Sequence, residues 1–351
     1  MVKDLCFEII EKCPNNCKFC SSNSNSLKTR LIKFDDFKRV IDYFMDNGGI
    51  SELSLSGGEP FLHPDLFSMI KYAKTYGIKT VIFTSGVVKN EKLNIEQKNF
   101  LQKEMNERID EVKKYEPWNT RLISNIKKYY MNYIDPNEYT NISKATFKYL
   151  ENIGLDKIVF DYQGYERKTD NDLMGRDEAS REAMLNSLLY AGLSNLDVDV
   201  HFIPMKKNYK EIIDILEMLE IAGIKNISIL NFVPQGRGRK NVEELKLSHY
   251  ELNDFFEIIS NYKKYYSGRI RIGIPLQKEN SHKCTAGLEK IDIKFDGTVL
   301  PCPAFKELTE EEAIKYNIKL YNIYDSIDKV VVPGYGTRIE PLCKKLYKVN
   351  K

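Results

Sequence analysis

Hydrophobic positions along the first 265 residues alternate between two spacings. Short apolar runs favour strands, and apolar positions three or four residues apart favour helices. The predicted strands span residues 6–10, 52–56, 79–84, 157–162, 196–203 and 226–232. The predicted helices span residues 35–47, 64–76, 143–152, 177–191, 209–222 and 248–265. Six strand–helix units in this order predict an α/β fold, with a parallel sheet and helices outside it.

Two segments interrupt this alternation. Residues 88–142 form a long polar stretch without a strand signal, and Leu101, Met105, Ile109 and Val112 follow a helical spacing within it. We expect a helical insertion there, which is either a surface element or a lid or docking element over a site.

The second interruption is the C-terminal part, where the alternation is expected to stop after about Gly268. Residues 290–295 and 298–300 flank Asp296-Gly297, a strong signal for a β-hairpin. We therefore predict two domains, an α/β domain over residues 1–267 and a small β-hairpin/α domain over residues 268–351.

Composition and charge exclude several classes of protein. Hydrophobic residues make up 42% and charged residues 29% of the 351 residues, which is typical of a folded soluble protein. The formal net charge of +3 gives no reason to expect binding to nucleic acid or to a membrane surface. No secretory signal and no membrane-spanning stretch is evident, so we expect a cytoplasmic protein with reduced thiols.

The seven cysteines are unevenly distributed. An odd number in a cytoplasmic chain argues against a disulfide framework. Cys6 falls in the first predicted strand, where a core position is the better interpretation. The other six form an N-terminal and a C-terminal group: Cys13, Cys17 and Cys20, then Cys284, Cys302 and Cys343. This grouping predicts two separate metal sites.

The N-terminal group lies on a predicted loop, Cys13-Pro-Asn-Asn-Cys17-Lys-Phe-Cys20, directly after the first strand. Three thiolates on one loop can hold three irons of a cubane cluster, and the absence of a fourth leaves one iron open. On spacing alone, zinc, a redox dithiol and a chance gathering of buried cysteines remain open. Zinc would need a fourth ligand, and the nearest histidine is His63.

The spacing Cys-x-x-x-Cys-x-x-Cys, with Phe19 before the last cysteine, resembles the signature of the radical S-adenosylmethionine (SAM) superfamily. Ser56-Gly57-Gly58-Glu59-Pro60 at the end of the second strand resembles that family's second signature, which lies against the methionine part of SAM. Two glycines permit close backbone approach. Thr84-Ser85-Gly86, Asp161 and Pro234-Gln235-Gly236-Arg237-Gly238 resemble further family elements.

The resemblance covers about residues 1–265 and implies a partial (βα)6 TIM-like barrel. All its motifs follow strands, so they would open on one edge of the sheet, where ligands bind in parallel α/β folds. It implies cofactor binding by Phe19, Gly57, Gly58, Glu59, Ser85, Asp161 and Arg237. The insertion at 88–142 departs from the family's pattern and leaves the closure of the cavity open.

The chemistry implied by the resemblance belongs to the cofactors. A [4Fe–4S] cluster on Cys13, Cys17 and Cys20 would bind SAM at its open iron. The reduced cluster would cleave SAM to a 5′-deoxyadenosyl radical, which abstracts a hydrogen atom from the substrate. An electron donor of the flavodoxin or ferredoxin type is implied as a partner.

The C-terminal cysteines resemble the auxiliary-cluster extensions called SPASM when complete and twitch when shortened. Cys284, followed by Gly297 and then by Cys302 five residues later, fits the first half of that pattern, and only Cys343 is left for the second half. The resemblance implies one auxiliary [4Fe–4S] cluster whose fourth ligand is unknown. Zinc at Cys284 and Cys302, and a free thiol at Cys343, remain alternatives.

Three other residues are considered. His201 in the fifth strand is more often structural than catalytic at such a position, although it could line a cavity. Arg176 and Arg237 could hold a carboxylate by bidentate bonds, and plain surface charge is the competing interpretation for Arg176.

The sequence therefore predicts a radical SAM enzyme whose substrate is a peptide or a small molecule, and we favour peptide modification of the type found in ribosomally made peptides. The chain starts at the first barrel strand without a leader-binding domain, which slightly weakens the expectation of a peptide substrate. A non-catalytic iron–sulfur protein and a zinc-stabilised interaction module are the alternatives from other classes.

Overall fold

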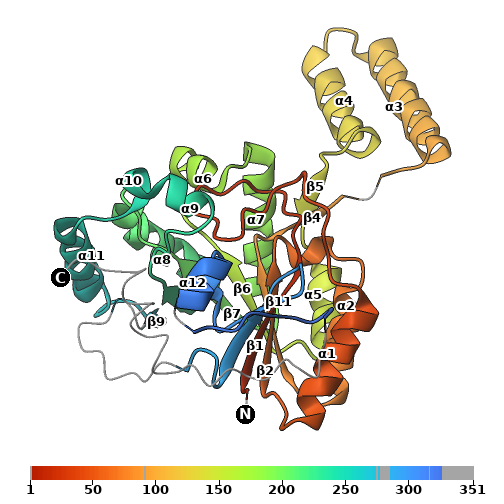
Figure 1. The fold of residues 1–351 in the computed structure, drawn as a ribbon. Helices are drawn as coiled ribbons and strands as arrows, with labels where there is room; N and C mark the ends of the chain where they lie inside the picture. Colours follow the sequence, from red (N-terminus) through yellow and green to blue (C-terminus); the bar gives the residue numbers. More distant parts are fainter. Residues whose placement is uncertain (1, 91, 274–275, 277–284, 316, 326–351) are drawn as a thin grey trace. The chain divides into compact units, whose positions relative to one another are not determined.

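The computed structural model describes residues 2–90, 92–273, 276, 285–315 and 317–325. Its central feature is a sheet whose ten strands run in the order β12-β11-β10-β1-β2-β3-β6-β7-β8-β9 (Figure 1). The strands are β1 (Asp4–Ile10), β2 (Glu52–Gly57), β3 (Lys79–Thr84), β6 (Lys157–Asp161), β7 (Asp197–Phe202), β8 (Asn226–Ile229), β9 (Arg269–Ile272), β10 (Lys290–Ile293), β11 (Thr298–Leu300) and β12 (Tyr321–Asn322).

The six predicted strands are β1, β2, β3, β6, β7 and β8, and each pairs in parallel with its neighbour. This confirms the α/β prediction with a mostly parallel sheet. β8 ends at Ile229, three residues earlier than predicted. The chain after it turns toward the cysteine loop, where the Arg237 N–H donates to the Cys20 carbonyl at 3.0 Å.

Two strands extend the sheet beyond the predicted six. β9 pairs in parallel with β8, so the alternation continues one strand further than the expected end at Gly268. The predicted hairpin forms as β10 and β11, and β10 also pairs in parallel with β1. The first and last parts of the described chain are therefore neighbours in one sheet.

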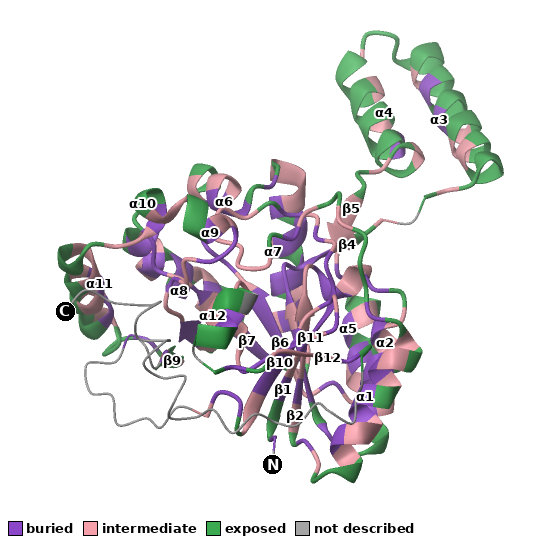
Figure 2. Cartoon of the chain, in the orientation of Figure 1, coloured by how far each residue is buried: buried purple, intermediate pink, exposed green. Residues whose placement is uncertain are grey.

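Helices cover the outer face of this sheet, because each strand presents alternate hydrophobic side chains to them. The sheet is largely buried beneath the helices (Figure 2). Leu5, Phe7 and Ile9 are buried, and Phe7 stacks on Phe37 of α1 at 5.6 Å between ring centroids. The helices are α1 (Phe34–Asp46), α2 (Leu66–Thr75), α5 (Lys144–Asn152), α6 (Arg167–Met174), α7 (Glu178–Gly192), α8 (Ile212–Ile221), α9 (Arg237–Lys240), α10 (Val242–Leu245), α11 (His249–Tyr262) and α12 (Glu310–Lys315). Short 3-10 turns occupy Pro60–Leu62, Tyr209–Glu211 and Pro303–Phe305.

Helix starts follow the expected chemistry in most cases. Ser143, Asp177 and Ser248 each accept a backbone N–H at a helix N-terminus, and Ser248 with Glu251 forms a capping box. Asp35 does not cap its helix. α1 begins one residue earlier, with Lys33 at the capping position, so Asp35 lies in the first turn.

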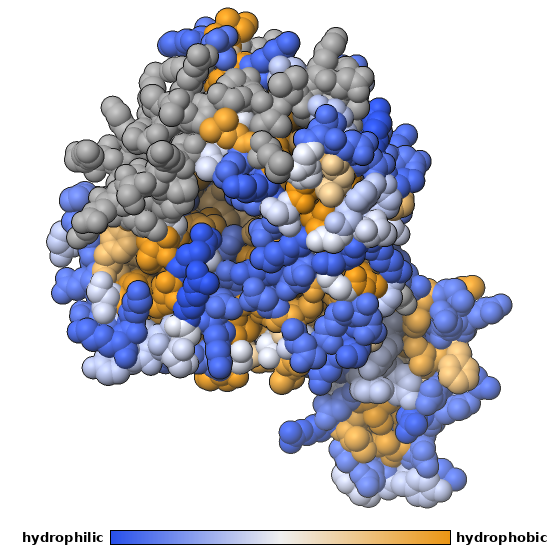
Figure 3. Space-filling view, turned by 90° about the horizontal axis from the view of Figure 1, so that it is seen from below, coloured by the Kyte–Doolittle hydropathy of each residue, from blue (hydrophilic) through white to orange (hydrophobic). Residues whose placement is uncertain are grey.

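The insertion forms its own compact unit over residues 88–140. It contains α3 (Ile95–Tyr115) and α4 (Thr120–Ile134), as predicted, and also two short strands, β4 (Val87–Lys89) and β5 (Tyr139–Asn141), which pair with each other. Met105, Ile109 and Tyr130 form its core. Large hydrophobic side chains also remain exposed on its surface (Figure 3), among them Trp118 at 76%.

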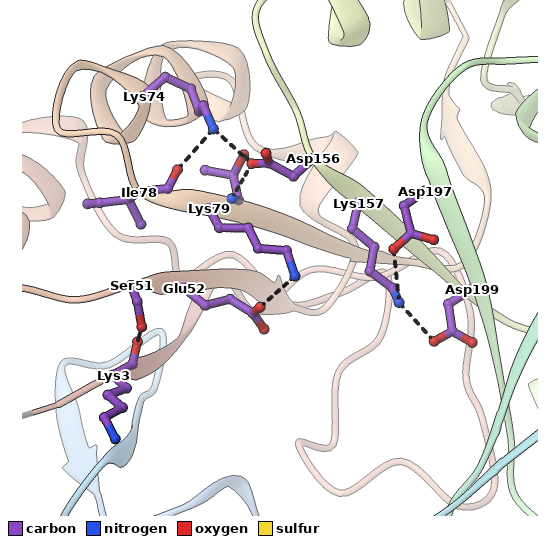
Figure 4. A network of polar contacts seen from close by, with 11 residues as sticks. Lys3, Ser51, Glu52, Lys74, Ile78, Lys79, Asp156, Lys157, Asp197 and Asp199 are labelled. Carbon is purple, nitrogen blue, oxygen red and sulfur yellow. Dashed lines mark hydrogen bonds and ion pairs between the residues drawn. The ribbon is translucent and has the colours of Figure 1, made fainter.

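The amino ends of the parallel strands carry ion pairs rather than apolar contacts (Figure 4). Lys79 pairs with Glu52 at 3.0 Å, and Lys157 lies 3.0 Å from Asp199 and 3.4 Å from Asp197. The motifs identified in the sequence follow the strands, so they lie at the opposite, carboxyl edge. None of the helices in the described ranges is long and apolar enough to cross a membrane.

Candidate active site

Three thiols gather on the loop that leaves β1. Cys13 is buried, and Cys17 and Cys20 are partly buried. Burial raises the pKa of the Cys13 thiol, and so do the nearby Cys17, Glu59 and Cys20. Burial, followed by Cys20, raises the pKa of Cys17 in the same way. The thiols are therefore close enough to oppose one another's ionisation.

The backbone of this loop is held from several sides. The Asn16 and Lys18 N–H groups donate to the carbonyls of Met174 and Leu173, at the end of α6. The Cys13 N–H donates to Asn25 at 3.1 Å. α6 was not predicted, because its sequence is almost entirely polar, yet its end forms one wall of the loop.

Glycines allow this close approach. A Cβ atom at Gly58 would lie 2.1 Å from the Lys12 carbonyl oxygen, and one at Gly57 would lie 2.3 Å from that of Ile10. A Cβ at Gly175 would meet Asn16 at 2.4 Å, and one at Gly236 would meet Cys20 at 2.4 Å. Four glycines from three separate segments thus lie against the end of β1 and the loop that follows it.

Arg237, the first residue of α9, holds the loop through two hydrogen bonds. Its Nε donates to the Cys17 carbonyl at 2.8 Å, and its Nη2 donates to the Ser24 carbonyl at 2.6 Å. The guanidinium therefore positions the loop that carries the cysteines. Phe19 lies against a small apolar cluster that contains Leu173 and Phe232.

Glu59 ties the end of β2 to the end of β3. Its carboxylate accepts hydrogen bonds from Thr84 at 2.7 Å, from the Ser85 hydroxyl at 2.5 Å and from the Ser85 N–H at 2.6 Å. It is completely buried, and burial raises its pKa to about 7 although these hydrogen bonds oppose that shift. Ser85 and Glu59 are thus direct neighbours, as expected from their places after adjacent strands.

Asp161, at the end of β6, lies near the same thiols. Its charge contributes to the raised pKa of Cys17. Burial raises the pKa of Asp161 itself to about 6, against the opposing effects of Lys306 and Arg176. The carboxyl edge of the sheet therefore brings the cysteine loop, Glu59 with Ser85, and Asp161 together.

Arg176 is not a surface charge. Its side chain is 1% exposed, and its Nε and Nη2 donate to Asp170 at 2.8 and 2.5 Å. Arg181 lies 3.7 Å from the same Asp170 oxygen, so two buried guanidinium groups share one carboxylate. Among the described residues, Nη1 of Arg176 has no hydrogen-bond partner.

The thiols fit a cluster better than a single metal ion. In the described residues no three His, Cys, Asp or Glu side chains converge tightly enough to hold one ion. An iron–sulfur cluster takes each thiolate on its own iron, so its ligands need only surround it. Buried thiols without a cation keep their protons, and metal binding replaces those protons.

The model of the radical SAM superfamily matches residues 7–246. This chain belongs to the radical SAM superfamily. The match includes the cysteine loop, Glu59, Ser85, Asp161 and Arg237. Members of this superfamily use a [4Fe–4S] cluster and SAM, and the predicted enzyme class is confirmed.

Among characterised proteins the chain is 21% identical to the PqqA peptide cyclase of Bradyrhizobium diazoefficiens, over 88% of this chain and 69% of that protein. It is 22% identical to a probable GTP 3′,8-cyclase of Methanococcus aeolicus, over 86% and 85%. It is also 22% identical to the subtilosin biosynthesis protein AlbA of Bacillus subtilis, over 85% and 54%.

Two solved radical SAM structures share the fold. Streptococcus suis SuiB bound to S-adenosylmethionine superposes with a TM-score of 0.62 at 17% identity, over 93% of this chain. Native anSMEcpe with bound AdoMet and the Kp18Cys peptide gives 0.59 at 13% identity, over 99% of this chain and 84% of that one. The chain spans 65% of SuiB. These neighbours confirm the partial barrel.

Of the predicted auxiliary-cluster cysteines of this radical SAM protein, Cys302 alone lies in the described part of the chain. Cys284 and Cys343 lie outside the described residues. Cys302 is partly buried and precedes the turn Pro303–Phe305, whose Phe305 packs with Ala286 and Ile318. The auxiliary cluster therefore stays a prediction.

Several site residues were missed in the sequence. Gly175, Asp170 and Arg181 belong to no recognisable motif. The one sequence signal near them is the glycine itself, because glycine often follows the end of a helix. The burial of Glu8 and Lys306 was also not predicted from the sequence, because a charged residue in a strand or turn is ordinarily exposed. His201 is partly buried, with its ring 5.2 Å from that of Phe83, and desolvation lowers its pKa to about 4.

Proposed function

We propose that this chain holds its radical SAM cluster with Cys13, Cys17 and Cys20 and modifies a peptide. The observation that carries the first part is the convergence of three thiols on a loop clamped by four glycines and Arg237. When bound, the cluster and SAM supply an electron and a 5′-deoxyadenosyl radical, which abstracts a hydrogen atom.

The residues around the loop have distinct proposed tasks. Gly57 and Gly58 let the backbone approach SAM, and Glu59 with Ser85 fixes the turn that carries them. Arg176 offers its free Nη1 to the carboxylate of SAM, because a guanidinium is the natural partner of a carboxylate. Asp161, which raises the pKa of Cys17 and is itself affected by Lys306, is the residue that we propose to face SAM or the substrate.

The peptide substrate is inferred from the relatives. PqqA peptide cyclase is named for a peptide, and SuiB has been solved with its precursor peptide SuiA bound. We propose the same substrate class here, with an external electron donor of the flavodoxin or ferredoxin type and one auxiliary cluster at Cys284, Cys302 and Cys343. We place the enzyme in the cytoplasm.

The cluster assignment is tested by anaerobic reconstitution, with iron counted per chain and 5′-deoxyadenosine measured after dithionite reduction. The triple change Cys13→Ala, Cys17→Ala, Cys20→Ala should remove about four irons and all 5′-deoxyadenosine. Cys6→Ala is the matched control, since Cys6 lies on β1 below the loop, and it should keep both. Equal iron in the triple variant and the wild type would refute the assignment.

The peptide assignment is tested with deuterated candidate precursor peptides. A peptide substrate should transfer deuterium into 5′-deoxyadenosine and leave with a changed mass. If nucleotides or sugars transfer the label and peptides do not, the enzyme acts on a small molecule instead.

A further inference from the structure

A buried charged cluster lies on the inner face of the sheet, and the proposed chemistry does not use it. Glu8 of β1 and Asp292 of β10 are both completely buried. Lys306, just after the turn Pro303–Phe305, lies 2.5 Å from Glu8 and donates to the Ser22 hydroxyl at 3.0 Å. Ser22 in turn donates to Glu8 at 2.6 Å. Four separate segments of the chain therefore meet at this cluster.

The cluster faces the inside of the barrel. Along β1, Phe7 points outward against α1, so Glu8 and Cys6 point the other way. Cys6 is opposite Asp292 in the register of β1 and β10. Lys306 lies close enough to Asp161 to lower the pKa of that carboxyl, and Asp161 in turn acts on Cys17. The cluster is thus beside the place where the reaction is proposed.

Its charges do not balance. Two carboxylates face a single ammonium group, Lys306. In the described part of the chain, the Asp292 carboxylate and Oε2 of Glu8 accept no hydrogen bond from an N–H or O–H group, and the weak thiol donor of Cys6 is the side-chain partner of Asp292. The oxygens of buried carboxylates ordinarily accept hydrogen bonds, and those of a purely structural group of charges would accept them as well. Burial and the neighbouring Glu8 raise the pKa of Asp292 to about 7, so the empty site takes up a proton as pH falls through that value.

A metal ion does not fit this gap. The described residues hold no group of three metal-ligating side chains there, and Lys306 already occupies one side. An organic cation fits better, because its N–H groups would donate to the free carboxylate oxygens.

We propose that Glu8 and Asp292 form a subsite that binds a cationic group of the substrate, an ammonium or guanidinium, inside the barrel. This proposal rests on the proposed function for the peptide substrate. That peptide then carries a lysine or arginine at or next to the modified residue. Lys306 occupies part of the subsite and leaves it with a net charge of minus one when both carboxylates are ionised.

The test uses the reconstituted enzyme with SAM and two probes that differ only in charge, Nα-acetyl-lysine methylamide and Nα-acetyl-norleucine methylamide. Calorimetric titration at pH 8 should show saturable binding of the lysine probe and at least tenfold weaker binding of the norleucine probe. Glu8→Gln and Asp292→Asn should each weaken the lysine probe at least tenfold. Glu52→Gln, a carboxylate on the same sheet at its amino edge, is the matched control and should bind as the wild type does.

A second variant keeps the test decisive if the carboxylate variants fail to bind their iron–sulfur cluster. Lys306→Met leaves both carboxylates without an ammonium, so it should bind the lysine probe at least threefold more tightly. Equal binding of the two probes by the wild type and by Lys306→Met would overturn the proposal, as would unchanged binding in both carboxylate variants.

The pH dependence of cation binding distinguishes a binding role of Asp292 from a purely structural one. Asp292 is faced by Glu8 and Cys6 of β1, by Lys306, and by Lys290 of its own strand. Binding of the cation should tighten as pH rises through about 7 and flatten in Asp292→Asn. 5′-Deoxyadenosine measured in the same samples separates the two proposals, since its loss with cation binding intact counts against the proposed function alone.

Discussion

Individual side chains in this site mostly hold the cysteine loop in place. Gly57, Gly58, Gly175 and Gly236 leave room for backbone carbonyls that any Cβ atom would strike, and Arg237 binds two more carbonyls. The Gly-Gly-Glu sequence thus has a structural reason in addition to the proposed approach of SAM, since the Gly58 N–H donates to Ile10 at 2.6 Å and the Glu59 N–H to Lys12 at 2.8 Å.

Asp170 gives a prediction at this scale. Changing it to Asn leaves Arg176 and Arg181 as two buried charges without a carboxylate. We expect the free energy of unfolding to fall by about 3–5 kcal/mol, the usual effect of breaking a buried ion pair. Urea unfolding of the cluster-free protein measures it.

Asp172 provides the matched control, two residues along α6. It pairs with Lys18 and Lys207 at a partly exposed position. Asp172→Asn should lower the free energy of unfolding by about 1 kcal/mol or less. Equal losses in the two variants would show that the buried pair has no special weight.

At the scale of elements, the sequence predicted what depends on periodicity and short motifs. The six parallel strands and the hairpin at Asp296-Gly297 follow from such patterns. β9 and α6 were missed, because the first has only four residues and the second is polar. The pairing of β10 with β1 joins residues nearly the whole chain apart, and no local pattern encodes it.

The insertion gives the prediction at this scale. Residues 88–140 form a unit with its own core, and none of its residues belongs to the ten-stranded sheet. Replacing residues 93–136 with a short Gly-Ser turn between β4 and β5 should leave iron content and SAM binding within about twofold of the wild type.

The measurements are iron per chain, the dissociation constant for SAM and the thermal midpoint. A matched replacement of α5, which packs its Phe147 and Leu150 into the core, should abolish folding. Loss of iron from the insertion variant would contradict the independence of the two units.

At the scale of the whole molecule, buried carboxyls and exposed ones respond oppositely to pH. Burial raises the pKa of Glu59 and of Asp292 to about 7 each. Between their ordinary values and pH 7 the folded chain holds protons that the unfolded chain has released. Stability of the cluster-free protein should therefore fall as pH rises from about 5 to 7, by at most about 1.4 kcal/mol per pH unit for each group.

Carboxylates with a lowered pKa set the acid limit. Ion pairs and hydrogen bonds lower the pKa of Asp156 and Asp172, so their stabilisation is complete above the ordinary value and is lost as pH falls below about 4. Urea midpoints between pH 3 and 8 should pass through a maximum near 5. Asp292→Asn should reduce the loss on the alkaline side, and an unchanged slope in that variant would contradict the assignment.

The pairing of β10 with β1 also bears on synthesis. Lys3 and Glu289, which form an ion pair beside these two strands, are 286 residues apart. A ribosome adds about 5–20 residues per second, so β1 has one open edge for roughly 15–60 s after it emerges. During that interval the cysteine loop lacks Lys306 and the hairpin beside it. Until β10 has been made, the outer edge of β1 stays unpaired, and such an edge can pair with strands of other chains.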